Sequence, residues 1–362
     1  MIEWIAPSFE ILVALTTFLK ENWKKITFQK KDKFLNYKLR YLFDLYGQEV
    51  PVAIHIPYTE VINFVQPDLI NESAIEITVK PSDFILQPGK EAWNTIKEKG
   101  FTSLVNDKRI RQDANEPVVR LSGVAKADKT TLLVQKARYN DQARSNLLMD
   151  FEHKVHGVHR TFRQYLHDEF DGHLPPIGEE RLANSVGIAA LILYKEKGVW
   201  IPYLLRRTKS LAVFPGTIQC TASGAAKWIG ENPSTFNELF TNHMYDELNE
   251  EVGLKKEDIQ NFHPVALCRE FVRGGKPQLI YIGTTELDGA QLAKKRHAAK
   301  RVLKNEGGLQ EIEADTWLRK AHVKYNSDAI NSSLFHKNVS HETILCLHYL
   351  PQYLLKFNLH HT

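Results

Sequence analysis

Three glutamates within five residues form the stretch whose spacing best suits chemistry. Glu247, Glu250 and Glu251 lie in the run Asp246-Glu247-Leu248-Asn249-Glu250-Glu251-Val252-Gly253-Leu254. An α-helix ending at Gly253 would bring positions i, i+3 and i+4 onto one face, where like charges cost roughly 0.2–0.5 kcal/mol per pair. A divalent cation removes that repulsion, and Mg²⁺ takes oxygen ligands and bridges to substrate phosphates. The spacing therefore predicts a magnesium site, with a solvated acidic face as the alternative.

This stretch resembles the end of the box that defines Nudix hydrolases. The family box reads Gly, five residues, Glu, seven residues, and then Arg-Glu-apolar-any-Glu-Glu-any-Gly-apolar. Every position from Glu247 to Leu254 matches it, whereas Asp246 stands where the family has Arg. Apolar runs, a small-residue turn at Ser223-Gly224 and a later strand extend the resemblance over about residues 178–362.

The first half of the box aligns in two ways. Strict counting places Glu238 at the family's Glu and Asn232 at its Gly. Matching Gly224 to that Gly leaves about seven extra residues before Glu247, which is close to two helical turns. An extended helix would absorb them without rotating the glutamates out of place, so we favour the alignment on Gly224.

The resemblance implies hydrolysis of a pyrophosphate bond in a nucleoside diphosphate derivative, with Mg²⁺ as the cofactor and Mn²⁺ as a substitute. It implies Glu247 and Glu251 as the best metal ligands. Glu250 would be a further ligand or the base that orients water, and Glu247 is the second catalytic candidate. The backbone carbonyl of Ser223 would add a ligand. Glu270 follows the box as the expected late carboxylate; a surface ion pair with a neighbouring arginine is the alternative.

Substrate contacts are expected from Arg206, Arg207 and Gly224. A guanidinium presents two parallel donors to a phosphate, and strand alternation lets only one of two neighbouring arginines face the site. In the family, the missing arginine orients the catalytic carboxylates. Its replacement by Asp246 keeps a second function open, namely an inactive Nudix-like domain that binds a nucleotide as a sensor or regulatory protein.

Basic residues gather in a segment that is expected to be helical. They could contact a polyanionic substrate or RNA, although a charge run usually forms a solvated face and no aromatic residues interleave for base stacking. The segment contains Lys294, Lys295, Arg296, Lys300, Arg301 and Lys304.

Composition fits a globular chain of 362 residues with a net charge of +4, long enough for two ordinary domains. Its three cysteines are widely spaced and odd in number, which suits a reducing cytoplasm. Residues 4–19 are mostly apolar and lysines follow, so residues 4–33 could associate with a membrane. That run is shorter than the roughly 20 residues needed to span one, and it contains Pro7 and Glu10. A packed or interfacial helix is the favoured interpretation.

The pattern of elements predicts the α+β class. An apolar helix (1–24) precedes a small α+β module of unknown role (25–150) with strands at 52–56 and 75–79, a helix at 91–99 ended by Gly100, and a hairpin of 118–124 with 131–136. A His-rich helical linker (151–177) follows. The last part (178–362) has strands at 185–194 and 199–206, a helix at 232–252 and later strands. The resemblance implies a Nudix-like α/β/α sandwich with a mixed sheet for it.

Overall fold

The structure is a computed structural model, and it describes residues 33–34, 39–49, 56–66, 74–110, 113, 115–155, 157–206, 216–231, 233–302, 310–311 and 339–359. The predicted helix at 1–24, residues 52–55 of the predicted strand at 52–56, Arg207 and Lys304 lie outside these residues, and residue 56 itself is not in a strand. Among the helices that are described, none is long and apolar enough to cross a membrane.

The first half of the chain alternates short helices with strands. Its elements are β1 (Lys33–Phe34), α2 (Leu39–Tyr46), η1 (Gly47–Glu49), β2 (Tyr58–Asn63), β3 (Ile75–Val79), α3 (Glu91–Asn106), β4 (Pro117–Lys126), β5 (Thr130–Arg138), α4 (Tyr139–Ala143), η3 (Asn146–Leu148), β6 (Phe151–Val155), β7 (Val158–Thr161) and α5 (Phe162–Glu169). The predicted strand at 75–79 and the predicted hairpin of β4 with β5 are confirmed.

The second half contains the longest strands and the acidic helix. Its elements are β8 (Gly187–Glu196), β9 (Val199–Pro202), β10 (Leu205–Arg206), β11 (Ile218–Gln219), β12 (Ala222–Ala225), η4 (Asn237–Thr241), α6 (Asn242–Val252), η5 (Lys256–Asp258), β13 (Gln260–Glu270), β14 (Lys276–Thr284), α7 (Gly289–Val302), β15 (Gln310–Glu311) and α10 (His341–Lys356). The predicted α+β class is confirmed.

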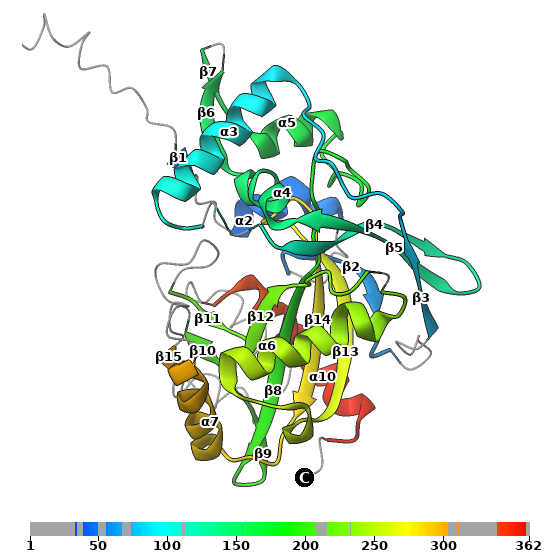
Figure 1. The fold of residues 1–362 in the computed structure, drawn as a ribbon, viewed down its shortest axis with the longest axis vertical. Coiled ribbons are helices and arrows are strands. Elements are labelled where there is room, and N and C mark those ends of the chain that lie inside the picture. The colour runs from blue at the N-terminus through cyan, green and yellow to red at the C-terminus, as the bar shows by residue number, and fades with distance from the viewer. Residues whose placement is uncertain are drawn as a thin grey trace, which may run out of the picture.

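A mixed sheet organises this half. Its strand order is β12-β8-β14-β13-β2, and β9 pairs with the C-terminal end of β8. The β8–β14 pair is parallel and the other pairs are antiparallel. In Figure 1, α6 crosses in front of this sheet and α10 lies behind it, so helices cover both faces.

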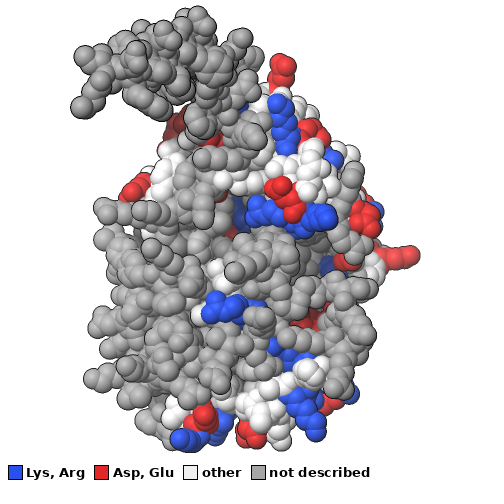
Figure 2. Space-filling view, turned by 90° about the vertical axis from the view of Figure 1, so that its left-hand side faces the viewer, with Lys and Arg blue, Asp and Glu red and all other residues white. Residues whose placement is uncertain are grey.

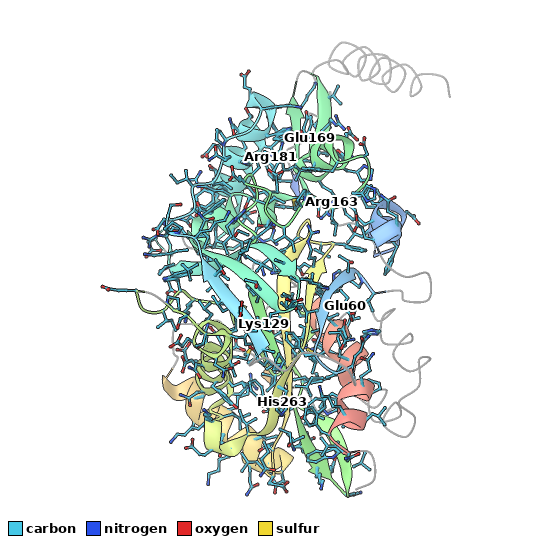
Figure 3. The ribbon with its side chains drawn as sticks, turned by 90° about the vertical axis from the view of Figure 1, so that its right-hand side faces the viewer. Glu60, Lys129, Arg163, Glu169, Arg181 and His263 are labelled. Atoms are coloured by element: carbon cyan, nitrogen blue, oxygen red, sulfur yellow. The ribbon has the colours of Figure 1, made fainter. Side chains whose placement is uncertain are left out.

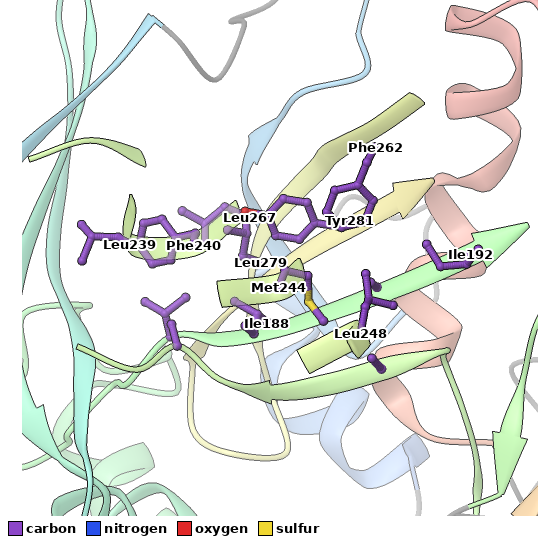
Figure 4. Close-up of a cluster of buried hydrophobic side chains, with 14 of the residues drawn as sticks. Ile188, Ile192, Leu239, Phe240, Met244, Leu248, Phe262, Leu267, Leu279 and Tyr281 are labelled. Carbon is purple, nitrogen blue, oxygen red and sulfur yellow. The ribbon is translucent and has the colours of Figure 1, made fainter. Parts of the chain in front are cut away.

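Strand β8 shows why the sheet needs two helical layers. Every residue from Gly187 to Tyr194 is buried, as expected of a central strand covered on both faces. Alternate side chains divide between two cores. Ile188 and Ile192 pack with Met244 and Leu248 of α6, a cluster shown in Figure 4, whereas Leu191 lies in the core beneath α10. Burying a side chain such as Leu248 contributes roughly 1.5–3 kcal/mol, which fixes the rotation of α6.

Strand β2 joins the two halves of the chain. It lies within the predicted 25–150 module, yet it pairs with β13 in the mixed sheet. Tyr349 of α10 donates a hydrogen bond of 2.5 Å to the Glu60 carboxylate of β2, and Figure 3 shows Glu60 beside that helix. Residues of β4 and β5, including Leu121 and Val134, share the core beneath α6. Residues on both sides of the predicted boundary at 178 therefore contribute to one core.

Two predicted elements differ from the structure. Helix α3 does not end at Gly100 but runs on to Asn106. Glycine at position 100 lets Leu148 and Phe151 pack closely against the helix, because a Cβ there would lie 3.0 Å from their side-chain atoms. In the described residues of the His-rich segment, α5 is the helical part, since the first part forms the β6–β7 hairpin. The helix starts late because the Thr161 hydroxyl accepts a hydrogen bond from the Gln164 backbone N–H and thereby caps it.

Candidate active site

The acidic helix is well defined at both ends. It continues a five-residue π-helical stretch, η4 (Asn237–Thr241), so the helical segment begins later than the predicted helix at 232–252. The Glu238 carboxylate accepts hydrogen bonds from the Ser234 and Thr235 backbone N–H groups, which lower its pKa, so this glutamate serves the start of the helix. At the other end Gly253 takes the left-handed conformation with φ 70°, which confirms the predicted C-cap.

Two of the three glutamates lie against the small-residue strand β12. The Ser223 backbone N–H donates a hydrogen bond of 3.2 Å to Glu251 Oε2. A Cβ built on Gly224 would lie 2.8 Å from Glu247 Cδ, closer than real contacts allow. Glycine is therefore required at position 224 by the close approach of Glu247. Ser223 and Gly224 do not form the predicted turn but lie in β12, and there they meet the acidic helix.

Sequence reasoning did not identify two residues that contact these glutamates. His243 is buried one turn before Glu247 on α6, and its Nε2 lies 3.1 Å from Glu247 Oε1. The Lys227 backbone N–H donates a hydrogen bond of 2.9 Å to His243 Nδ1. The Lys227 ammonium lies 3.8 Å from Glu247 Oε1 and 4.0 Å from Glu250 Oε2. The i, i+4 spacing of His243 and Glu247 was the signal in the sequence that could have found this pair.

The surroundings of the three carboxylates bear on metal binding. Among the described residues, no three His, Cys, Asp or Glu side chains are grouped so that they could hold a metal ion. The carboxylates turn to protein groups instead: Glu247 and Glu250 to Lys227, and Glu251 to β12. Their chemistry nevertheless suits Mg²⁺, since carboxylate oxygens are the ligands this ion prefers.

Glu270 lies elsewhere. It follows Cys268, whose side chain packs in the core beneath α10, so strand alternation turns Glu270 toward α10. Its buried carboxylate accepts a hydrogen bond of 2.8 Å from Arg273 Nη2, and the same nitrogen donates 2.7 Å to Glu342 of α10. Glu270 therefore takes the ion pair that was the alternative to a late metal ligand, in the interior and not at the surface.

This buried charge cluster changes the titration of its neighbours. Burial raises the pKa of Tyr58 well above its usual value, and the nearby Glu270 carboxylate raises it further. Lys276 is fully buried, and burial together with the charge of Arg273 lowers the pKa of its amine to about 7. The sequence offered an ion pair of Glu270 with an arginine, but it did not indicate Glu342, which comes from a separate element.

The basic residues that are expected to contact the substrate have protein partners where the structure describes them. Arg206 Nη1 donates a hydrogen bond of 3.1 Å to the Gly216 carbonyl, and Arg207 lies outside the described residues. In the basic segment, Lys295 pairs with Asp258 at 2.8 Å and Arg296 is buried. Over the described surface drawn in Figure 2, basic and acidic side chains are interspersed. A role of this segment in nucleic-acid binding stays a prediction.

Comparison with known proteins assigns no family. No family model matches the chain, and no curated protein matches it. Among solved structures, the crystal structure of DR0079 from Deinococcus radiodurans is similar over 38% of this chain and 82% of that chain, with 15% sequence identity and a TM-score of 0.22. A similarity at this level carries no argument about fold or function.

Proposed function

We propose that the chain hydrolyses a pyrophosphate bond in a nucleoside diphosphate derivative, and that the acidic face of α6 holds the Mg²⁺ or Mn²⁺ required. The observation that carries the proposal is the packing of α6 on β12, with Glu251 at the Ser223 N–H and Glu247 over Gly224. The resemblance to the Nudix box predicts that these same residues belong to one site. A mixed sheet between α6 and α10 supports a Nudix-like sandwich.

Each glutamate has a role that follows from its surroundings. Glu247 and Glu251 are held against the backbone of β12, which suits metal ligands, and the proposed Ser223 carbonyl ligand lies on the same strand. Glu250 has a half-exposed side chain, so it can reach water and act as the base or as a further ligand. A bound Mg²⁺ supplies neutralisation of the phosphate charge and orientation of the pyrophosphate. Glu270 is not part of this site.

A nucleotide-binding domain without catalysis is the second candidate. Asp246 is exposed on α6 where the family has its arginine, and the Lys227 ammonium already balances part of the carboxylate charge. Such a domain would gain thermal stability from a nucleotide and release no product.

A hydrolysis screen separates the two candidates. Purified full-length protein is incubated with Mg²⁺ or Mn²⁺ and with ADP-ribose, nucleotide sugars, dinucleoside polyphosphates, nucleoside triphosphates and capped RNA, and the melting temperature is measured with each compound. Release of a nucleoside monophosphate or phosphate that stops on chelation supports the hydrolase. A melting-temperature increase without product supports the binding domain, and neither effect with any compound contradicts both.

A further inference from the structure

We propose that His243 is a positioning residue for Glu247, and that it takes the place of the arginine that Asp246 replaces. The inference rests on the proposed function. Its basis is the contact chain from the Lys227 backbone N–H through the buried imidazole of His243 to the Glu247 carboxylate.

The hydrogen bond from Lys227 determines which nitrogen of His243 carries the proton. A backbone N–H can only donate, so Nδ1 accepts at 2.9 Å and the proton of the neutral ring lies on Nε2. Nε2 lies 3.1 Å from Glu247 Oε1, although its alignment falls outside linear hydrogen-bond geometry. This arrangement is the one by which a second partner commonly orients a metal-ligating group.

Packing holds the ring and the carboxylate in this relation. His243 is 1% exposed, so water does not compete for its Nε2. His243 and Glu247 are one helical turn apart on the same face of α6. On its other side, Glu247 meets Gly224, where a Cβ would lie 3.0 Å from Oε2. The carboxylate is thus confined between the imidazole and the backbone of β12.

Lys227 also supplies a positive charge to the glutamates, and it does so from outside the helix α6. In this chain the residue before Glu247 is Asp246, which is exposed and cannot attract a carboxylate. The Lys227 ammonium, whose side chain is 37% exposed, approaches Glu247 and Glu250 from the segment after β12. Orientation and charge, which an arginine would supply from the helix, come here from His243 and Lys227.

Titration with Mn²⁺ tests the role of His243 apart from turnover. The affinities of wild type, His243→Leu, His243→Gln and the double variant His243→Leu/Asp246→Arg are measured by electron paramagnetic resonance on the full chain. We expect His243→Leu to weaken binding about 10- to 100-fold, the range usual for partners of a metal ligand. Gln can donate from nearly the position of Nε2, so His243→Gln should stay within a few-fold of wild type. Arginine at 246 should recover at least 10-fold of the loss, a rescue that a purely structural histidine would not permit.

Unchanged affinity in His243→Leu, an equal loss in His243→Gln, or no recovery in the double variant would overturn the inference. Glu247→Gln identifies which idea has failed. If wild type and Glu247→Gln bind Mn²⁺ equally or not at all, the proposed function fails. If wild type binds, Glu247→Gln does not, and His243→Leu equals wild type, only the positioning role fails.

A second measurement needs no variant at His243 to fold. Nitrogen-15 NMR of wild-type imidazoles, with Glu247→Gln used for assignment, reports the tautomer of His243. We expect the Nε2–H form, with a resonance that shifts on addition of Mg²⁺ in wild type and does not shift in Glu247→Gln. An Nδ1–H form, or no shift at a Mg²⁺ concentration that saturates the site, would contradict the proposal.

Discussion

Replacement of Arg273 by Met should strongly lower the free energy of unfolding of the protein. It should leave the local structure of the acidic helix α6 unchanged. Arg273 donates hydrogen bonds of 2.8 and 2.7 Å to the buried carboxylates of Glu270 and Glu342. Hydrogen bonds to charged groups contribute about 1.5–3 kcal/mol each, and breaking a buried ion pair costs about 3–5 kcal/mol. Both carboxylates are buried, so solvent screening does not reduce the figure much. The ratio of folded to unfolded protein should fall by roughly two to four powers of ten.

Urea unfolding followed by circular dichroism measures this loss. The control is the triple variant Arg273→Met/Glu270→Gln/Glu342→Gln, which leaves no unpaired carboxylate and should recover more than half of the loss. A second control is Glu270→Gln alone, which should lower the urea midpoint and leave Mn²⁺ affinity within about twofold. A loss below about 1 kcal/mol in Arg273→Met would refute the reasoning about the buried cluster. A large loss of Mn²⁺ affinity in Glu270→Gln would return Glu270 to the metal site.

Three further predictions follow from the same contacts. Gly224→Ala should lower Mn²⁺ affinity at least about 10-fold, because the added Cβ would displace Glu247 from β12. Metal titration measures this affinity, and an unchanged value would argue against the close approach of Glu247 to Gly224. Gly253→Ala should cost about 1 kcal/mol or more in urea unfolding, because its φ is positive and its Cβ would meet the Lys295 carbonyl at 2.7 Å; an unchanged midpoint contradicts this. Lys276 has a folded-state pKa of about 7, below its unfolded value of 10.5, so the unfolded state binds more protons between these values. Wild-type stability should therefore rise relative to Lys276→Met between pH 7 and 9.5, and a constant difference would show that the amine is not desolvated.

Local patterns in the sequence predicted the parts that depend on neighbouring residues. The apolar run at 185–194 predicted the strand β8, whose lack of polar positions fits a strand covered on both faces. Gly253 identified the end of α6 because the left-handed cap favours glycine. The spacing of Glu247 and Glu251 placed both on one helical face, and the structure brings both to β12.

The features that the sequence did not predict depend on contacts between segments that are far apart in the chain. Strand β2 joins β13 across about two hundred residues, which no local pattern encodes. Glu270 was expected as a late metal ligand or in a surface ion pair, but it is buried and Arg273 bridges it to Glu342. Gly100 looked like a helix stop, whereas its missing side chain makes room for Phe151. The hydrogen bond from the Lys227 backbone N–H to His243 joins two elements, so the helical spacing of His243 and Glu247 alone did not reveal it.

Hydrolysis by wild type and Glu251→Gln is the most direct measurement of the central claim. With Mg²⁺ and the best compound of the screen, wild type should release product. Glu251→Gln should be slower by about a hundredfold or more, because the amide neutralises a metal ligand without changing its shape. Glu257→Gln, an exposed glutamate on η5, is the matched control and should equal wild type. Equal turnover in wild type and Glu251→Gln, with both proteins folded, would contradict the account.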